Sequence, residues 1–486
     1  MERLRGLRRY IGTRAFYREM LTVSMPIALQ QFVTSLVNSL DTVMIANWGG
    51  SNATAAISLA NRYFTTFNML MMALAVTCSV YIAQYYGAKQ YHRLKQIFGI
   101  NLVLTGVLAL LAFTIGLAFQ DPIIGFFTGA EAGTDFIVRE YGAQYLGLVA
   151  FSFLPQAVTN ALTFTYRPLR QTKIPLYSAI TAAVTNALFN WWFIYGGLGI
   201  PAMGIQGAAY ATIISRLFEM GVLLIYFFVK KPLFYGKIRE IFSFTGTMFR
   251  DVFTRGRPLL VSQALTQTMA IFMLFVFARI EVGNATNVAA FTVSTQLVDI
   301  VVVFIGGMGT AASVMIGSRL GANQLEEAKQ NARYQVTYVI LFSILASIVL
   351  VLLIPLTEIA FNFDPSEYEL LSALMILHAL SFPFMVYSLN IIFITRAGGY
   401  NRAPYYITNL VYYGIKLPII IFFVYLMPSL FAESAGLHQG LSALGLPPTF
   451  MVFVFLIDRM MEVLRAIVAY YVYTRADWCR NIVKLT

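Results

Sequence analysis

Charge is scarce in this sequence. Asp, Glu, Lys and Arg make up 12% of the 486 residues, whereas hydrophobic residues make up 58%. A chain of this length with so few charges is too apolar for a soluble globular protein, which excludes that class. Hydrophobic segments of membrane-spanning length recur along the whole chain. The sequence therefore predicts an all-α polytopic membrane protein.

Residues that bind metals or form disulfides are scarce as well. The two cysteines, Cys78 and Cys479, lie far apart and predict neither a disulfide framework nor a metal site. The three histidines are scattered without the spacing of metal ligands. The sequence also lacks a GxxxxGKS/T phosphate loop and a nucleotide-binding domain. We therefore expect no enzyme, no catalytic residues and no cofactor. The driving force must come from an ion gradient, from the substrate's own gradient or from a partner.

The distribution of charge predicts how the chain crosses the bilayer. The twelve predicted spans are residues 18–46, 54–84, 97–119, 137–162, 174–196, 204–229, 251–280, 287–316, 333–356, 370–394, 404–427 and 449–473. Most of the 34 Lys and Arg residues fall in the tails and in alternate loops on one side, while the opposite loops hold only Arg139 and Arg279. By the positive-inside rule, both termini are cytoplasmic in a multi-pass protein of the plasma membrane (the cell inner membrane). The net charge of +12 thus indicates the lipid bilayer as partner, and we expect no nucleic acid partner.

The chain contains an internal repeat. Residues 16–35 (FYREMLTVSMPIALQQFVTS) align with residues 248–267 (MFRDVFTRGRPLLVSQALTQ), which places Pro258 opposite Pro26. The later motifs YGAKQ and LGANQ align as well. Two halves of six helices each are typical of secondary transporters, which bind substrate near the interface of their repeats. The predicted domains are a cytoplasmic N-terminal segment (1–17), an N lobe (18–229), a cytoplasmic basic linker (230–250), a C lobe (251–473) and a cytoplasmic C-terminal tail (474–486).

The first predicted span carries a polar stripe. Gln30, Thr34, Asn38 and Asp41 are spaced i, i+4, i+8 and i+11. These positions fall within roughly 80° of one another on a helix. A carboxylate in an apolar run is expensive to bury, so Asp41 is a functional candidate and the rest of the stripe is a candidate lining of a substrate cleft. The alternatives are that Asp41 caps the helix end or pairs with Arg62.

The repeat gives an independent test of Asp41. The fifth span places Asn186 and Asn190 at i and i+4, on one helix face. The C-lobe counterparts of Asp41, Asn186 and Asn190 are the apolar Met273, Ile415 and Ile419. Requirements of the scaffold should be shared by both halves, so polar residues kept by only one half are the better functional candidates. Asp41 and Asn190 lie late in spans that start on the cytoplasmic side, which predicts a site in the outer half of the membrane.

Several motifs together resemble a known family. They are Pro26 and Asp41 in the first helix, the G-A-x-Q loops after helices two and eight, the R-x-x-x-x-x-K-x-P segment before helix five, and GIQGAAYATIISR at 204–216. With the repeat, they make the chain similar to multidrug and toxic compound extrusion (MATE) transporters of the multidrug/oligosaccharidyl-lipid/polysaccharide flippase superfamily. The resemblance implies V-shaped lobes around a central cleft, alternating access, coupling to H⁺ or Na⁺ influx, and export of amphiphilic or cationic compounds. We expect a monomer.

The resemblance also implies where the ion binds. In the DinF-type branch, the N-lobe cation site uses a helix-one Asp, an Asn and an acid one turn apart on helix five, and a helix-six Thr. Asp41, Asn186 and Thr212 match that pattern, whereas Asn190 stands where the helix-five acid would be. One carboxylate remains, so either H⁺ or Na⁺ at Asp41 is open, and no other metal is expected. The branch with acids on helices seven and ten fits worse, and Asp299 in helix eight is the C-lobe acid that could compete.

Other polar residues within the spans have structural interpretations. Arg216–Glu219 and Arg459–Glu462 are i, i+3 pairs at equivalent positions of the two halves, which favours structural ion pairing. We expect Asp458 to join the second pair.

Two further groups of polar residues leave alternatives open. Gln156 and Asn160 give helix four a polar face, suited either to interhelical hydrogen bonding or to lining the cleft. Lys416 either pairs with Asp299 or contacts an anionic substrate.

These features favour an ion-coupled antiporter. Exchange of a proton or Na⁺ at Asp41 would alter helix one around Pro26, where the missing backbone hydrogen bond makes a bend inexpensive. The alternative within the superfamily is a lipid-linked saccharide flippase, which should place several cations in its cavity, whereas this chain has few intramembrane Arg or Lys. A non-transporting scaffold does not account for the N-lobe acid, and a channel should show a filter motif.

Overall fold

The computed structural model describes residues 10–126, 134–197, 199–279, 285–361, 365–428, 431 and 434–483. The helices are α2 (Arg14–Gly87), α3 (Tyr91–Ala118), α4 (Gln120–Gly125), α5 (Thr134–Val149), η1 (Ala150–Ser152), α6 (Phe153–Tyr166), α7 (Lys173–Tyr195), α8 (Gly204–Lys230), α9 (Ile238–Ile241), α10 (Gly246–Arg279), α11 (Ala285–Gly321), α12 (Leu325–Leu352), α13 (Ile354–Phe361), α14 (Pro365–Ala397), η2 (Tyr405–Leu410), η3 (Tyr412–Lys416), α15 (Leu417–Leu426), α17 (Ala435–Ala443) and α18 (Phe450–Arg475). No strand occurs among these residues, which confirms the all-helical prediction.

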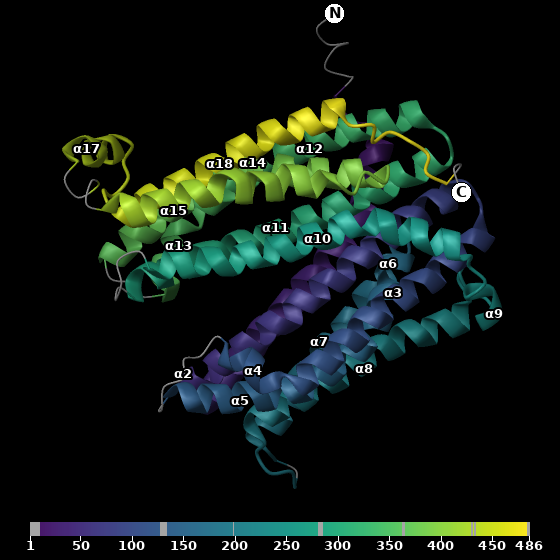
Figure 1. Ribbon diagram of the computed structural model, residues 1–486, viewed down its shortest axis with the longest axis horizontal. Helices are drawn as coiled ribbons and strands as arrows, with labels where there is room; N and C mark the ends of the chain where they lie inside the picture. The colour runs from purple at the N-terminus through teal and green to yellow at the C-terminus, as the bar shows by residue number, and fades with distance from the viewer. Residues whose placement is uncertain are drawn as a thin grey trace, which may run out of the picture. The chain divides into compact units, whose positions relative to one another are not determined.

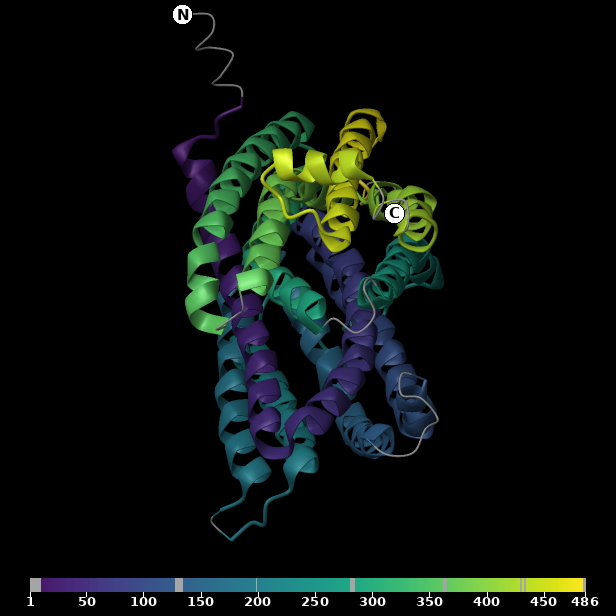
Figure 2. The ribbon, with the colours of Figure 1, turned by 90° about the vertical axis from the view of Figure 1, so that its left-hand side faces the viewer.

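Every predicted span falls on helix. Nine helices in the described part of the chain are long and apolar enough to cross a membrane. The three remaining predicted spans lie on α7, α10 and α18. The first two spans both lie on α2, which consists of two helices joined by a kink at Gly50, where φ is +63°. Figure 2 shows α2, in purple, turning back on itself at this point. A glycine suits the break because this backbone conformation is strained for residues with a Cβ atom.

The chain divides into two compact units. One unit comprises Thr22–Leu260, Gly317–Gln324 and Asn481–Thr486. Its largest core lies among α2, α3, α6, α8 and the start of α10, around fully buried aromatic residues such as Tyr85, Tyr166 and Phe234. Within this unit α7 packs along α8, and α3 packs along α6 (Figure 1). We call it the N-terminal unit because it contains most of the first half of the sequence.

The other unit comprises Met1–Leu21, Val261–Ile316 and Leu325–Arg480. In this C-terminal unit α14 packs against both α12 and α18 (Figure 1). Its core gathers apolar residues of α14 and α18 with residues of α10 and α15. Two π-helical turns, η2 and η3, precede α15. A π-helix is rare and is frequently found at functional sites.

The repeated G-A-x-Q motifs cross within the N-terminal unit. A Cβ atom on Gly87 would lie 1.8 Å from the backbone oxygen of Ser318, and one on Gly321 would lie 1.9 Å from the backbone oxygen of Gln84. Both distances are far inside van der Waals contact, so only glycine allows the two backbones to approach this closely. The repeat therefore keeps glycine at both positions because each motif packs against the helix end that carries the other.

The C-terminal tail covers this crossing. The Ile482 backbone N–H donates to the side-chain oxygen of Gln84 (2.8 Å), and the Asn481 amide donates to the Gly321 carbonyl (3.2 Å). Ile482 and Val483 are buried in the core of the N-terminal unit. The last described residues of the chain thus complete a core that is otherwise built largely from its first half.

Replacing Gly321 with alanine should destabilise the protein by at least about 2 kcal/mol, because a backbone oxygen must move to admit the new methyl group. We expect a lower unfolding temperature of the detergent-purified protein, followed by tryptophan fluorescence. Gly436→Ala is the matched control, because a Cβ atom there meets nothing within 4 Å. Equal unfolding temperatures for the two variants would contradict the requirement for glycine at the crossing.

Candidate functional site

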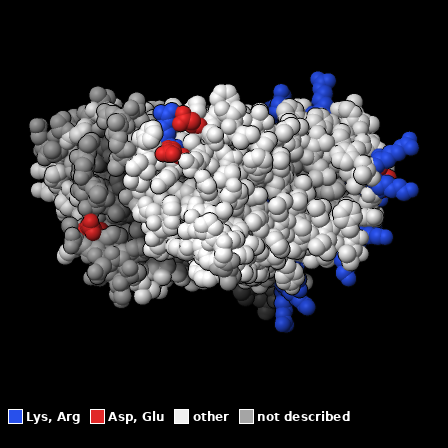
Figure 3. All heavy atoms as spheres, turned by 90° about the horizontal axis from the view of Figure 1, so that it is seen from below, with Lys and Arg blue, Asp and Glu red and all other residues white. Residues whose placement is uncertain are grey.

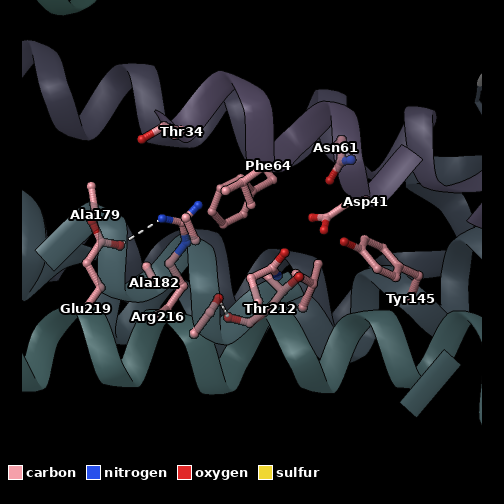
Figure 4. A pocket seen from close by; sticks show the side chains of 15 residues that line it. Thr34, Asp41, Asn61, Phe64, Tyr145, Ala179, Ala182, Thr212, Arg216 and Glu219 are labelled. Atoms are coloured by element: carbon pink, nitrogen blue, oxygen red, sulfur yellow. Dashed lines mark hydrogen bonds and ion pairs between the residues drawn. The ribbon is translucent and has the colours of Figure 1, made fainter. Parts of the chain in front are cut away.

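A polar cavity lies inside the N-terminal unit (Figure 4). It offers about 40 Å³ to the centre of a water-sized molecule, which is room for a few water molecules. The residues that line it are Thr34, Val37, Asp41, Asn61, Phe64, Tyr145, Val149, Ala179, Ala182, Ala183, Asn186, Thr212, Ser215, Arg216 and Glu219. They come from both spans of α2 and from α5, α7 and α8. The cavity therefore lies where four helices of the unit meet.

Asp41 is held by the amides of helix α7. Asn190 donates one N–H of its side-chain amide to the Asp41 carboxylate and the other to the side-chain oxygen of Asn186 (2.9 Å). Asn186 and Asn190 are buried, and Asp41 is half-buried. The side-chain oxygen of Asn190 is buried without a hydrogen-bond partner. The three residues singled out by the asymmetry of the repeat thus form one hydrogen-bonded chain.

The opposite wall of the cavity supplies hydroxyl groups. Tyr145 on α5 is 3% exposed, and its hydroxyl points toward Asp41 in Figure 4. The same hydroxyl interacts with Thr212. Thr212 in turn donates to the Ala208 carbonyl of its own helix (3.0 Å). Thr212, which the resemblance implied, therefore lines the same cavity as Asp41, and Tyr145 joins them.

A fixed ion pair closes the other end of the cavity. Arg216 donates to Glu219 one turn later on α8 (2.8 Å), which confirms the predicted i, i+3 pair. Figure 4 shows the Arg216 guanidinium between Glu219 and Phe64. Its charge also acts on Asp41. The pair is therefore part of the Asp41 cavity and not only a structural ion pair, which sequence spacing did not reveal.

One comparison with known proteins decides the family. The MatE family model matches residues 26–192 and 258–422, which together are more than half of the chain. The chain belongs to the MatE family. This MatE protein is therefore a transporter and not an enzyme. Its all-helical fold is consistent with the predicted layout of twelve spans in two six-helix lobes.

Curated relatives agree with this family, and solved structures agree with the fold. The chain is 28% identical over 322 residues to the probable multidrug resistance protein YoeA of Bacillus subtilis, covering 65% of this chain and 67% of that one. It is 27% identical over 342 residues to the probable multidrug resistance protein NorM of Synechocystis, covering 70% and 72%. A crystal structure of MATE in complex with MaL6 superposes with a TM-score of 0.80 at 18% identity, covering 94% and 95% of the two chains. A MOP superfamily transporter from Pyrococcus furiosus gives 0.76 at 20% identity, covering 94% of each chain.

The stripe on the first span of this MatE protein is only partly in the cavity. Thr34 lines it, whereas Gln30, 7% exposed, accepts a hydrogen bond from the guanidinium of Arg167 (2.9 Å). The side chain of Asn38 lies outside the described residues. Pro26 lies inside α2, on the same helix as Asp41.

The fourth predicted span (137–162), which comprises α5, η1 and α6, carries its predicted polar face inward. Gln156 donates to the side-chain oxygen of Asn160 (3.2 Å), and Asn160 donates to that of Asn68 on α2 (3.0 Å). Both Gln156 and Asn160 are buried. The structure thus supports interhelical hydrogen bonding for these two residues. Tyr145 comes three helical turns before Gln156, so the polar face of this helix was the signal that could have found it.

The C-terminal unit contains a buried ionic network in place of the predicted pair. Lys416 pairs with Asp458 (2.5 Å), and Arg459 donates its Nε–H to the same carboxylate (2.8 Å). Glu462 pairs with Arg465 (3.0 Å). The predicted Arg459–Glu462 pair is therefore wrong: Arg459 joins Lys416 at Asp458, and Glu462 pairs with Arg465. The expectation that Asp458 joins the network is confirmed.

Lys416 reaches Asp458 from the π-helical turn η3. Asp299, its predicted alternative partner, is exposed on α11, and in the part of the chain that the structure describes Lys416 pairs with Asp458 instead. Tyr412, one turn before Lys416, donates its hydroxyl to Glu462 (2.9 Å). Likewise, among the described residues the partner of Asp41 is Asn190 and not Arg62, which is exposed.

Proposed function

We propose that this MatE protein is an ion-coupled antiporter that exports amphiphilic or cationic compounds. Relatives that share its family are named as multidrug resistance proteins, which supports this substrate class. In this proposal the protein is a monomer in the plasma membrane, with both termini on the cytoplasmic side. Its lobes, 18–229 and 251–473, would alternate access to a cleft between them, joined by the linker 230–250. The observation that carries the proposal is the carboxylate of Asp41 in a polar cavity of the N-terminal unit.

We further propose H⁺ as the coupling ion. Sodium requires several oxygen ligands, but the amide nitrogen of Asn190 occupies the side of the Asp41 carboxylate where a cation would bind. The charge of Arg216 in the same cavity also opposes a second cation. A proton needs only the carboxylate and one acceptor. Rotation of the Asn190 amide would turn its unpartnered oxygen toward protonated Asp41, so the same residue serves both states.

Protonation would act on the helix that carries Asp41. The ionised carboxylate fastens α2 to α7 through Asn190, and this charge-assisted bond is stronger than a bond between neutral groups. Gaining a proton weakens the bond, which frees α2 to bend at Pro26 upstream on the same helix. The coupled change would favour release of the substrate outward, and loss of the proton inward would restore the starting state.

The ion is tested by efflux from proteoliposomes under a pH gradient or a Na⁺ gradient imposed separately. We expect the wild-type protein to respond to the pH gradient alone. Asn190→Asp should add Na⁺-driven transport, because a second carboxylate replaces the amide N–H groups with oxygen ligands. Transport by the wild-type protein that is driven by Na⁺ and indifferent to pH would overturn the assignment of H⁺.

A further inference from the structure

The segment between α8 and α10 is fixed to the N-terminal unit by one of its faces. Phe234 is fully buried and Ile241 is 6% exposed, and both belong to the core of the unit. Lys95 on α3 donates to Glu240 (2.8 Å), which ties the short helix α9 to the body of the unit. The segment therefore has a defined face that turns away from the protein.

That outer face is apolar at its centre. Ile238 is 77% exposed, and Leu233 and Phe242 are each 44% exposed. Ile238 stands between Lys237 and Arg239, which are exposed as well. An isoleucine that projects from a short helix between two cations gains nothing from water, and exposed apolar groups of this kind mark interaction sites.

The charge of this face is strongly positive. Its cations are Lys230, Lys231, Lys237 and Arg239, all exposed. The one acid of the segment is Glu240, and the ammonium group of Lys95 holds the pKa of that carboxyl below its usual value. Because Glu240 is already paired with Lys95, it offsets little of the charge of the four outward-facing cations. Figure 3 shows Lys and Arg gathered at the end of the molecule that carries α9.

The position of the segment along the chain sets its depth. Helix α8 ends at Lys230 and α10 begins at Gly246, and both cross the membrane in the proposed topology. The segment must therefore lie at the boundary between bilayer and water. Apolar side chains flanked by Lys and Arg are the pattern that binds the headgroup region, and the cytoplasmic leaflet is the anionic one.

We propose that residues 230–242 form a docking surface for anionic phospholipids of the cytoplasmic leaflet. Ile238, Leu233 and Phe242 insert among the upper acyl carbons, while Lys237 and Arg239 pair with headgroup phosphates. Lipid bound here steadies the start of α10 and the end of α8. The inference rests on the proposed topology, but its test needs no transport.

The test measures which lipid surrounds the segment. A fluorophore is attached to Gly246→Cys, where a side chain meets open space, in a background with Cys78→Ala and Cys479→Ser. The labelled protein is placed in vesicles that contain brominated phosphatidylglycerol or brominated phosphatidylcholine as quencher. We expect phosphatidylglycerol to be enriched roughly tenfold next to the label. Lys237→Gln combined with Arg239→Gln should bring the two lipids close to equal quenching.

The control variant removes two positive charges from outside the segment. Lys89 and Arg402 are exposed cations outside the segment, and Lys89→Gln with Arg402→Gln should leave the enrichment unchanged. Equal quenching of the wild-type protein by both lipids would overturn the proposal, as would an equal effect of the control. A label protected from both lipids and from aqueous iodide would show that a second copy of the chain covers the segment in place of lipid, which would also overturn the proposal. Failure of drug efflux affects none of these readouts.

Discussion

Asp41→Asn should reduce gradient-driven efflux to the level of vesicles without protein, while the purified protein folds as the wild type does. Asparagine has the size of aspartate and can still accept a hydrogen bond from Asn190, so the hydrogen-bonded chain to Asn186 is preserved. Asparagine cannot take up or release a proton, however. The variant therefore lacks the carboxylate that is bonded to α7 and that couples transport to pH in the proposed mechanism. Efflux from proteoliposomes under an imposed pH gradient measures the loss.

The matched control for this variant is Asp299→Asn. It removes the acid of the second half that could compete with Asp41. Asp299 lies on α11 in the C-terminal unit and is exposed. We expect Asp299→Asn to retain most of the activity. If both variants transport normally, Asp41 is a structural residue. If only Asp299→Asn is inactive, coupling belongs to the C-terminal unit.

Asp458→Asn should be among the most destabilising single substitutions in the protein, at about 3–5 kcal/mol. Asp458 is 1% exposed and balances both Lys416 and Arg459. The network around it holds three cations and two carboxylates. Removing Asp458 leaves the buried Lys416 and the half-buried Arg459 without their direct ionic partner, and Glu462 then faces three cations. The measurement is the unfolding temperature in detergent, together with the fraction of protein that elutes as a single species.

Lys416→Met provides the comparison for Asp458→Asn. It removes one of the three cations and leaves Asp458 paired with Arg459, so the remaining charges balance. We expect it to change stability by less than about 1.5 kcal/mol, because methionine fills much of the same space. A loss of stability as large as that of Asp458→Asn would show that the Lys416 contact itself, and not the balance of charge, holds the network.

The sequence was sufficient to predict the helical fold and the centre of the candidate site. Hydrophobic length alone located the spans, and the comparison of the two halves singled out Asp41, Asn186 and Asn190, which the structure joins by hydrogen bonds. That success has a physical basis. The spacing of Asn186 and Asn190 fixes their common face on one helix, and a buried carboxylate must be close to a polar partner.

The sequence was insufficient wherever the answer depended on a neighbouring helix. On α18, Glu462 has an arginine three residues before it and another three residues after it, so helical spacing allows either pair. Lys416 decides between them, because its ammonium group adds to Arg459 at Asp458 and leaves Glu462 to Arg465. Lys416 faces Asp458 from a π-helical turn, and no local pattern in the sequence predicts that change of helical pitch.

The buried C-terminal tail has a consequence for how the chain is made. Domains usually fold as units while the ribosome is still working, and the part synthesised first folds first. Here the core of the N-terminal unit contains Ile482 and Val483. The backbone N–H of Ile482 donates a hydrogen bond to the side chain of Gln84, 398 residues earlier in the sequence. The earliest helices to enter the membrane must therefore wait in an incomplete arrangement until Ile482 and Val483 have left the ribosome. A stalled or truncated product would present this gap in its core, and quality-control proteases could distinguish it from the finished protein.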